Sequence, residues 1–226
     1  MLSRESLAKE EFKDLMVDLY DDLPGLCKGL FPDIFVADFC GIHNKIFDSI
    51  ADKDKRFKLI LAPRGFGKTS IARAVAMDAI LFHKKNFIVY ISNSAPNAIM
   101  QTETLKHDLL SNKIIRKRFG DVREAVSELS SDEMIDIGVG GEVKDDTFAK
   151  TVWVAFGSTL VLPRGCGQQI RGLNWHNNRP DLVIADDIET VEDCMNENTR
   201  AKIRKWFFGD VCLCLDNLKQ DGEIIY

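Results

Sequence analysis

Apolar residues recur at two spacings along the chain, and each spacing predicts a type of element. Apolar positions three and four residues apart predict helices over 5–20 and 38–52. Short, mostly apolar runs over 57–62, 86–92 and 181–187 have the pattern of strands buried on both faces. The expected inward positions of the two helices are Leu7, Phe12, Leu15, Met16 and Leu19, and Ile42, Ile46, Phe47 and Ile50.

Helices and strands then alternate through the middle of the chain. Helices are expected over 69–83 and over 96–110, where Pro96 suits a first helical turn. Residues 150–165 predict two strands around a glycine turn at 157–158, a hairpin that either completes the edge of the sheet or contacts DNA or a neighbouring subunit. The alternation indicates an α/β fold with a mostly parallel central sheet flanked by helices and a β-hairpin excursion.

The remaining segments differ in character. Residues 123–146 are polar and rich in glycine and acids, which predicts a surface excursion. Residues 199–215 predict a helix, and 222–226 predict one more core strand, inside which the sequence stops. A truncated chain is therefore expected. The inward positions expected for the helix are Ile203, Trp206, Phe207 and Leu213.

Composition limits where this protein could contact nucleic acid. The chain has 226 residues, 45% of them hydrophobic, which suits one globular domain. Its formal net charge of -5 argues against a surface that wraps nucleic acid throughout, so such contacts should be local or shared among subunits. The most basic stretch, 111–123, contains Phe119 and is a candidate DNA or subunit contact; the alternative is a solvated helix end.

Cysteine usage and hydropathy bear on the compartment. The six cysteines are scattered, with no CxxC pair and no spacing typical of zinc sites, which predicts free thiols. The charged N-terminal residues do not form a secretory signal. No run approaches the roughly 20 apolar residues that span a bilayer. A soluble intracellular protein is expected.

Residues 62–69 predict a phosphate-binding loop. They match the P-loop pattern G-x-x-x-x-G-K-[ST], except that Ala62 replaces the first glycine. The two glycines at 65 and 67 permit the backbone geometry in which successive N–H groups face a phosphate. Lys68 would then reach the β- and γ-phosphates, and the Thr69 hydroxyl would bind Mg²⁺. The alternative is a glycine turn with an exposed lysine.

Acidic residues follow the buried strand predicted at 181–187. Asp186 is the candidate metal carboxylate, directly or through water, and a capped turn is the alternative. Asp187 and Glu189 are both candidates for the base that orients and deprotonates water. Arg64 lies four residues before Lys68, from where its side chain could neutralise charge on the γ-phosphate.

Three stretches together resemble one family. "LAPRGFGKTS" (61–70), "RGCGQQIRG" (164–172) and "RPDLVIADDIE" (179–189) are similar to motifs in the ATPase domain of large terminase subunits, the DNA-packaging motors of tailed bacteriophages and prophages. The likeness extends over most of the chain from about His43. It implies a P-loop NTPase of the RecA-like (ASCE) division that uses ATP and Mg²⁺ to drive DNA translocation.

The resemblance also assigns roles to individual residues. Lys68 and Thr69 resemble the family's phosphate and magnesium residues, and Asp186 its metal carboxylate. Asp187 stands where the family usually has a catalytic Glu, and Arg64 matches its in-loop arginine. The other residues that the resemblance places on the nucleotide are Pro63, Gly65, Phe66, Gly67 and Ser70 around the phosphates and His43 beside adenine; candidates for an arginine finger that enters a neighbouring subunit's site are Arg164, Arg171 and Arg179.

The family likeness predicts organisation and partners as well. Residues 1–52 would form a helical segment on the adenine side, and 53–226 the ATPase core, without the nuclease domain of complete large terminases. Expected partners are double-stranded DNA, the portal protein, the small terminase subunit and further copies in a ring, in the cytoplasm of the infected bacterial host and with no membrane. Such a chain should bind ATP, hydrolyse it poorly and leave DNA uncut.

Other functions fit parts of the same pattern. A helicase or another RecA-like nucleic-acid-dependent ATPase shares the loop, although a second RecA-like domain has no room here. A P-loop GTPase needs an N-K-x-D sequence, which "NKIF" (44–47) and "NKII" (112–115) lack. A third alternative is a nucleotide-binding assembly module that does not turn over.

Overall fold

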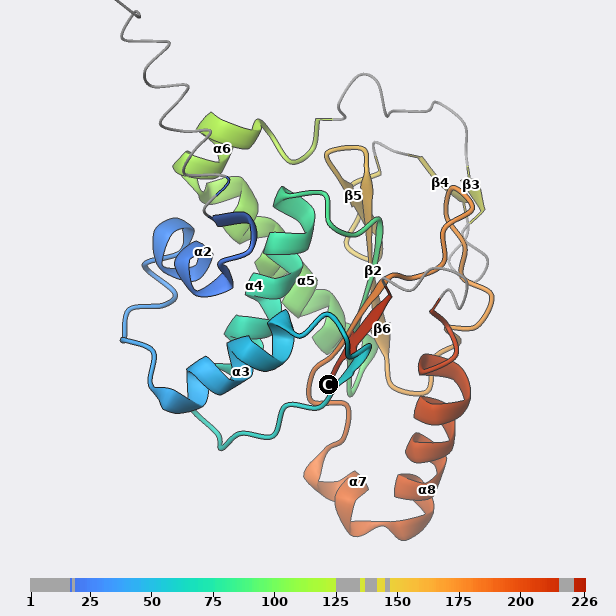
Figure 1. Cartoon of the computed structure of the whole chain (residues 1–226). Helices are drawn as coiled ribbons and strands as arrows, with labels where there is room; N and C mark the ends of the chain where they lie inside the picture. Colours follow the sequence, from blue (N-terminus) through green and yellow to red (C-terminus); the bar gives the residue numbers. More distant parts are fainter. Residues whose placement is uncertain (1–16, 18, 125–134, 137–141, 145–146, 216–221) are drawn as a thin grey trace, which may run out of the picture.

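The fold is known for most of the chain. A computed structural model describes residues 17, 19–124, 135–136, 142–144, 147–215 and 222–226 (Figure 1). In chain order the elements are α2 (Leu23–Leu30), α3 (Gly41–Ala51), β1 (Phe57–Lys58), α4 (Lys68–Leu81), β2 (Phe87–Ser92), α5 (Ala95–Ser111), α6 (Lys113–Phe119), β3 (Ile135–Asp136), β4 (Glu142–Val143), β5 (Trp153–Ala155), β6 (Thr159–Gly165), β7 (Leu182–Ala185), α7 (Val191–Met195), α8 (Glu197–Trp206), the π-helical turn η1 (Phe207–Val211) and β8 (Glu223–Ile225).

A six-stranded sheet organises these elements. Its strand order is β1-β8-β7-β2-β6-β5, and every neighbouring pair is parallel except β5 and β6. The expected α/β fold with a mostly parallel sheet is confirmed. Among the described segments, β3 and β4 form a separate antiparallel pair.

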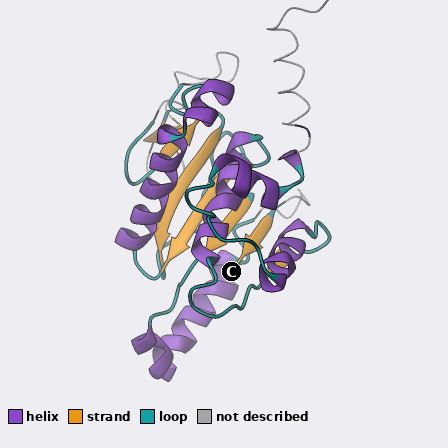
Figure 2. Ribbon diagram, turned by 90° about the vertical axis from the view of Figure 1, so that its left-hand side faces the viewer, coloured by secondary structure: helices purple, strands orange, loops and turns teal. Residues whose placement is uncertain are grey.

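The sheet separates two apolar cores, and helices lie on both of its sides (Figure 2). Alternate residues of β2 enter opposite cores, since successive strand side chains point to opposite faces. Ile88 and Tyr90 pack with α2 to α6, whereas Val89 and Ile91 pack with α8, η1 and the loop before β7. Every residue of β2 and β7 is buried, as expected for strands covered on both faces.

Local sequence explains where the helices beside the sheet begin. Gly67 precedes α4 in a left-handed conformation, with φ of 65°. At α5 the Ser94 hydroxyl caps the helix by accepting from Asn97 N at 3.4 Å, and Pro96 lies in the first turn as predicted. Both helices therefore start at the carboxyl edge of the sheet, α5 shortly after β2 and α4 after the loop that follows β1.

The first predicted strand is the clearest correction. Residues 57–62 were expected to be buried on both faces, but β1 covers only Phe57 and Lys58 and lies at the sheet edge. Phe57, Leu59 and Leu61 are 56%, 60% and 85% exposed. Pairing with β8 continues to Ile60, whose N–H donates to Tyr226 O at 2.7 Å. An apolar run does not reveal whether neighbours cover it, and that determines its burial.

The predicted hairpin belongs to the main sheet and is no excursion from it. β5 and β6 pair antiparallel, with Ala155 opposite Thr159, and β6 also pairs with β2 along its whole length. The turn uses left-handed residues at Phe156 and Gly157. The strands, the glycine turn and the alternative of a hairpin that completes the sheet edge are confirmed, whereas an excursion is not seen.

The predicted helix over 199–215 is also corrected. It is α-helical only to Trp206, continues as the π-helical turn η1, and then ends in turns. Leu213 is therefore 49% exposed instead of inward, while Val211 and Leu215 are buried. A π turn adds a residue to the helical period, which rotates the following side chains to a different face.

The N-terminal helices share the core of the sheet. Ile46 and Phe47 of α3 are buried in the same cluster as α2 and α4, whereas Ile42, in the first turn, is 40% exposed. The helix predicted over 5–20 and the excursion over 123–146 lie mostly outside the described residues. Phe119 of the basic stretch packs edge-to-face on Phe82 at 6.0 Å and is part of the core.

Two further sequence expectations concern thiols and membranes. All six cysteines are free. In the described parts of the chain, no helix combines the length and apolarity that crossing a membrane requires.

Candidate functional site

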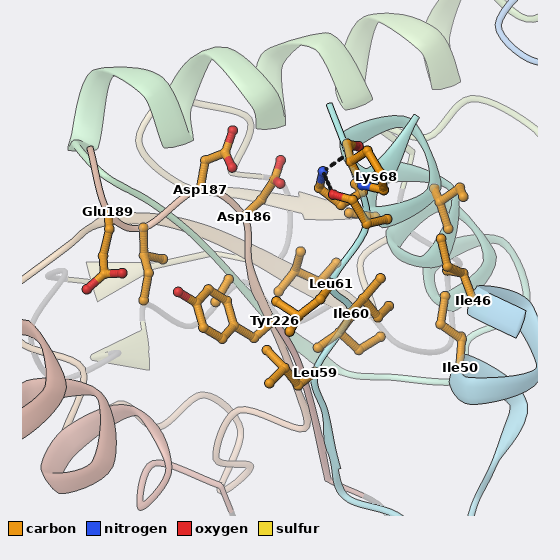
Figure 3. A pocket seen from close by; sticks show the side chains of 18 of the residues that line it. Ile46, Ile50, Leu59, Ile60, Leu61, Lys68, Asp186, Asp187, Glu189 and Tyr226 are labelled. Carbon is orange, nitrogen blue, oxygen red and sulfur yellow. Dashed lines mark hydrogen bonds between the residues drawn. The ribbon is translucent and has the colours of Figure 1, made fainter. Parts of the chain in front are cut away.

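A cavity of about 550 Å³ opens at the carboxyl edge of the sheet, where the loop after β1, the end of β7 and the start of α4 converge. Carboxyl ends of parallel strands are the usual position for ligands in α/β sheets. Five predicted site residues line this cavity: Pro63, Lys68, Asp186, Asp187 and Glu189. Figure 3 shows Lys68 and the two aspartates along one wall and apolar side chains along the other. The apolar residues labelled there are Ile46, Ile50, Leu59, Ile60, Leu61 and Tyr226.

The loop between β1 and α4 has the backbone geometry that its glycines suggested. Gly65 and Gly67 have φ of 85° and 65°, in the left-handed region. A Cβ added at either position would meet no atom within 4 Å, so backbone conformation and not crowding favours glycine. Thr69 and Ser70 follow in the first turn of α4, the end of a helix that attracts anions.

Lys68 is held by its own loop. Its Nζ donates to Ala62 O at 2.6 Å and to Pro63 O at 3.1 Å. In the described structure no carboxylate lies within ion-pairing distance of this ammonium group. Two carbonyl bonds leave one of the three ammonium donors for a further acceptor, so the charge of Lys68 is available to an anion in the cavity.

Asp186 lies between the helix and the sheet. Its carboxyl accepts a hydrogen bond from the Tyr90 hydroxyl at 3.1 Å, and Thr69 in the first turn of α4 lies close enough to influence it. Burial and the neighbouring Asp187 raise the pKa of this carboxyl, while Thr69, Tyr90 and the nearby Lys68 partly offset the rise. The lysine and the acid, 118 positions apart in the sequence (186 − 68), thus line one cavity.

Asp187 follows in an unusual backbone conformation. Its φ is 48°, a left-handed value that Asp and Asn tolerate better than most residues. Its carbonyl accepts from Asn93 N at 3.0 Å, which ties the turn to the end of β2. Figure 3 shows its carboxylate beside that of Asp186, while Glu189 points away, near Cys194. The local backbone is a physical reason for the shorter acid at this position.

His43 lies near the phosphate loop but not in the cavity wall. Its Nδ1 accepts from Cys40 N at 3.0 Å, and its ring lies 5.9 Å from that of Phe66 in the loop. α3 contributes Ile46 and Ile50 to the wall instead. The predicted contact of His43 with adenine stays a prediction.

The predicted arginines lie in different places. Arg64 is exposed, with no partner recorded in the described chain. Arg164 is the penultimate residue of β6, near the carboxyl edge, and burial lowers the pKa of its guanidinium group. Arg171 Nε lies 3.7 Å from Asp210 Oδ1, and Arg179 is exposed before β7, at the opposite end of that strand. None of these four lines the cavity.

Sequence reasoning missed two residues that organise the site. Tyr90 of β2 contacts Asp186, and Asn93, which directly follows β2, contacts Asp187. A tyrosine in the apolar run "FIVYIS" was the available signal, but its partner depends on the register between β2 and β7.

The donor set fits magnesium carried by a nucleotide. In the part of the chain that is described, no three His, Cys, Asp or Glu side chains are grouped to hold a metal ion. Mg²⁺ is commonly bound through one or two carboxylates together with substrate phosphates and water. Asp186 and Thr69 would supply the protein ligands. No protein-family model matches the sequence, and a search of curated proteins finds no significant match.

Proposed function

We propose that this chain binds ATP with Mg²⁺ and hydrolyses it. The observation that carries the proposal is the meeting of Lys68 and Asp186 at one cavity, between the start of α4 and the end of β7, with Thr69 close to the Asp186 carboxyl. The cavity also has a charged wall and an apolar wall, which suit the two parts of a nucleotide. Its volume of about 550 Å³ lies within the range of small-molecule sites.

The roles follow from position. Backbone N–H groups around Gly65 and Gly67 and the ammonium of Lys68 would bind phosphate oxygens. Thr69 and Asp186 would hold Mg²⁺, which neutralises charge on the phosphates. Asp187, next to the metal carboxylate, would orient the attacking water and accept its proton.

The resemblance to large terminase subunits suggests what ATP hydrolysis by this chain would drive. Hydrolysis would drive translocation of double-stranded DNA into a procapsid, in a ring that forms on the portal protein with the small terminase subunit. The exposed basic residues of α6, which include Arg116 and Arg118, are candidate DNA contacts. This purpose depends on the motif likeness alone.

Nucleotide binding by calorimetry and turnover with and without linear DNA test the proposal. Lys68→Ala should weaken Mg-ATP binding at least about tenfold, since it removes a charge-assisted phosphate contact. Lys202→Ala, which removes an exposed lysine of α8, is the matched control. Unchanged affinity in Lys68→Ala would refute the phosphate site, and binding without turnover would favour an assembly module.

A further inference from the structure

A buried tyrosine in the middle of the sheet reaches the proposed metal carboxylate. Tyr90 is 0% exposed, and its hydroxyl donates to Asp186 Oδ2 at 3.1 Å. Tyr90 of β2 pairs with Ile184 of β7, so Asp186 lies two residues further along on the same face of the sheet. The contact is therefore set by the register of two central strands.

Packing alone does not explain the hydroxyl. The ring lies in the apolar core with Ile88 and Ile184, where phenylalanine would fill the same space. A buried hydroxyl is unfavourable unless it is hydrogen-bonded, and within the described chain its recorded partner is Asp186. The hydroxyl therefore contributes its hydrogen bond to Asp186, and not additional packing in the core.

Tyr90 and Thr69 approach this carboxylate from two sides, and Tyr90 donates a hydrogen bond to it. Thr69 approaches from the first turn of α4 and Tyr90 from the sheet. A carboxylate accepts several hydrogen bonds, so a bond from Tyr90 to one oxygen fixes its rotation without using all its acceptor positions. A residue that orients a ligand in this way strongly affects metal affinity in known sites.

We infer that Tyr90 is a positioning residue: its hydroxyl keeps the Asp186 carboxylate turned toward Thr69, in the orientation that binds Mg²⁺ with the nucleotide. This inference rests on the proposed function. It adds a role for β2, from which no site residue was expected. Tyr90 itself does not line the cavity.

Magnesium titrations of nucleotide binding test the inference. Binding of a non-hydrolysable ATP analogue to the whole chain is measured over a range of Mg²⁺ concentrations and again with EDTA. In Tyr90→Phe the Mg²⁺ concentration for half-maximal binding should rise about tenfold or more. Affinity in EDTA should stay at the wild-type value, because Tyr90 acts through the metal ligand.

Two further variants separate positioning from packing. Thr159→Val removes another buried hydroxyl, which donates to Lys85 O at 2.9 Å away from the cavity, and should leave the Mg²⁺ requirement unchanged. In an Asp186→Asn background, Tyr90→Phe should change the requirement less than about twofold, since both act through one carboxylate. Thermal unfolding without ligand reports any loss of folding in each variant.

The outcomes distinguish failure of the inference about Tyr90 from failure of the proposed Mg-ATP binding. Equal Mg²⁺ requirements in wild type and Tyr90→Phe would overturn the inference alone. An equal loss of affinity with Mg²⁺ and with EDTA would show that Tyr90 serves packing, and would also overturn it. A wild-type chain with no Mg²⁺-dependent nucleotide binding would refute the proposed function itself.

Discussion

The two ends of the central strands each carry lysines and carboxylates, but they use them differently. At the amino end, Glu223 pairs with Lys58 and Lys85, and Asp78 pairs with Lys84 at 2.8 Å. At the carboxyl end, no described carboxylate pairs with Lys68, which binds loop carbonyls instead. Charges at one end are matched within the protein, and charges at the other face an open cavity.

Cavity size does not separate the two ends. The amino-end cavity is larger, at about 840 Å³ against about 550 Å³. Charged residues of its wall are paired within the protein: Asp78 with Lys84 at 2.8 Å and Glu223 with Lys85 at 2.9 Å. Buried charges need partners, so partners inside the chain indicate a structural role, whereas missing partners indicate a ligand.

The largest expected effect is at the carboxyl end. Asp187→Asn should lower ATP turnover about 100-fold or more, because it removes the general base. Asn also tolerates the left-handed backbone at this position, so ATP affinity and thermal stability should stay unchanged. Single-turnover hydrolysis with the matched variant Glu189→Gln as control measures the effect. Loss of turnover in Glu189→Gln alone would assign the base to Glu189.

Removal of a charge at the amino end should instead reduce stability. Glu223→Gln leaves Lys58, whose side chain is 1% exposed, without its carboxylate. Breaking such a buried pair costs about 3 kcal/mol or more of unfolding free energy. Urea unfolding measures this, with Glu192→Gln, an exposed acid of α7, as the control. If Glu223→Gln kept wild-type stability and lost ATP binding, the structural role assigned to the charges at the amino end would be wrong.

Asp78 gives the amino end a pH dependence. Burial raises the pKa of its carboxyl to about 6, partly offset by Lys84. Since the folded pKa lies above the unfolded value of about 3.9, the folded state binds a proton more tightly. Stability from this group is therefore full below about pH 4 and is lost as the pH rises through 6.

Asp78→Asn should remove that slope. The unfolding free energy of wild type minus that of the variant should fall between pH 4 and 7 by up to about 3 kcal/mol. Any cost of the substitution that does not depend on pH shifts both ends of the curve equally. Urea unfolding at several pH values measures the difference, and parallel curves for the two proteins would refute the assignment.

The sequence predicted the parts of the site that depend on local pattern. Glycines at 65 and 67 before a helix, and acids after the apolar run of β7, were visible without coordinates. The rule that parallel strands end at a common edge then brought Lys68 and Asp186 together. Local pattern and one topological rule were therefore sufficient to place Lys68 and Asp186 at the same edge of the sheet.

Features that depend on neighbouring strands were not predictable in the same way. The contact from Tyr90 to Asp186 requires the register of β2 against β7. Leu213 is exposed because of the π turn of η1, which no pattern in the sequence indicated. The exposure of β1 depends on its place at the sheet edge, since apolar runs look alike in covered and uncovered strands.

The smallest expected effect tests that last point. Leu61 is 85% exposed beside the cavity, whereas Leu182, at the amino end of β7, is 1% exposed. Leu61→Ala should change the unfolding free energy by less than about 0.5 kcal/mol, while Leu182→Ala should cost about 2 kcal/mol or more. Urea unfolding of both variants measures the contrast. Comparable losses would mean that other residues cover the run over 57–62, as its apolar pattern first suggested. The exposed position of this run at the sheet edge would then be wrong.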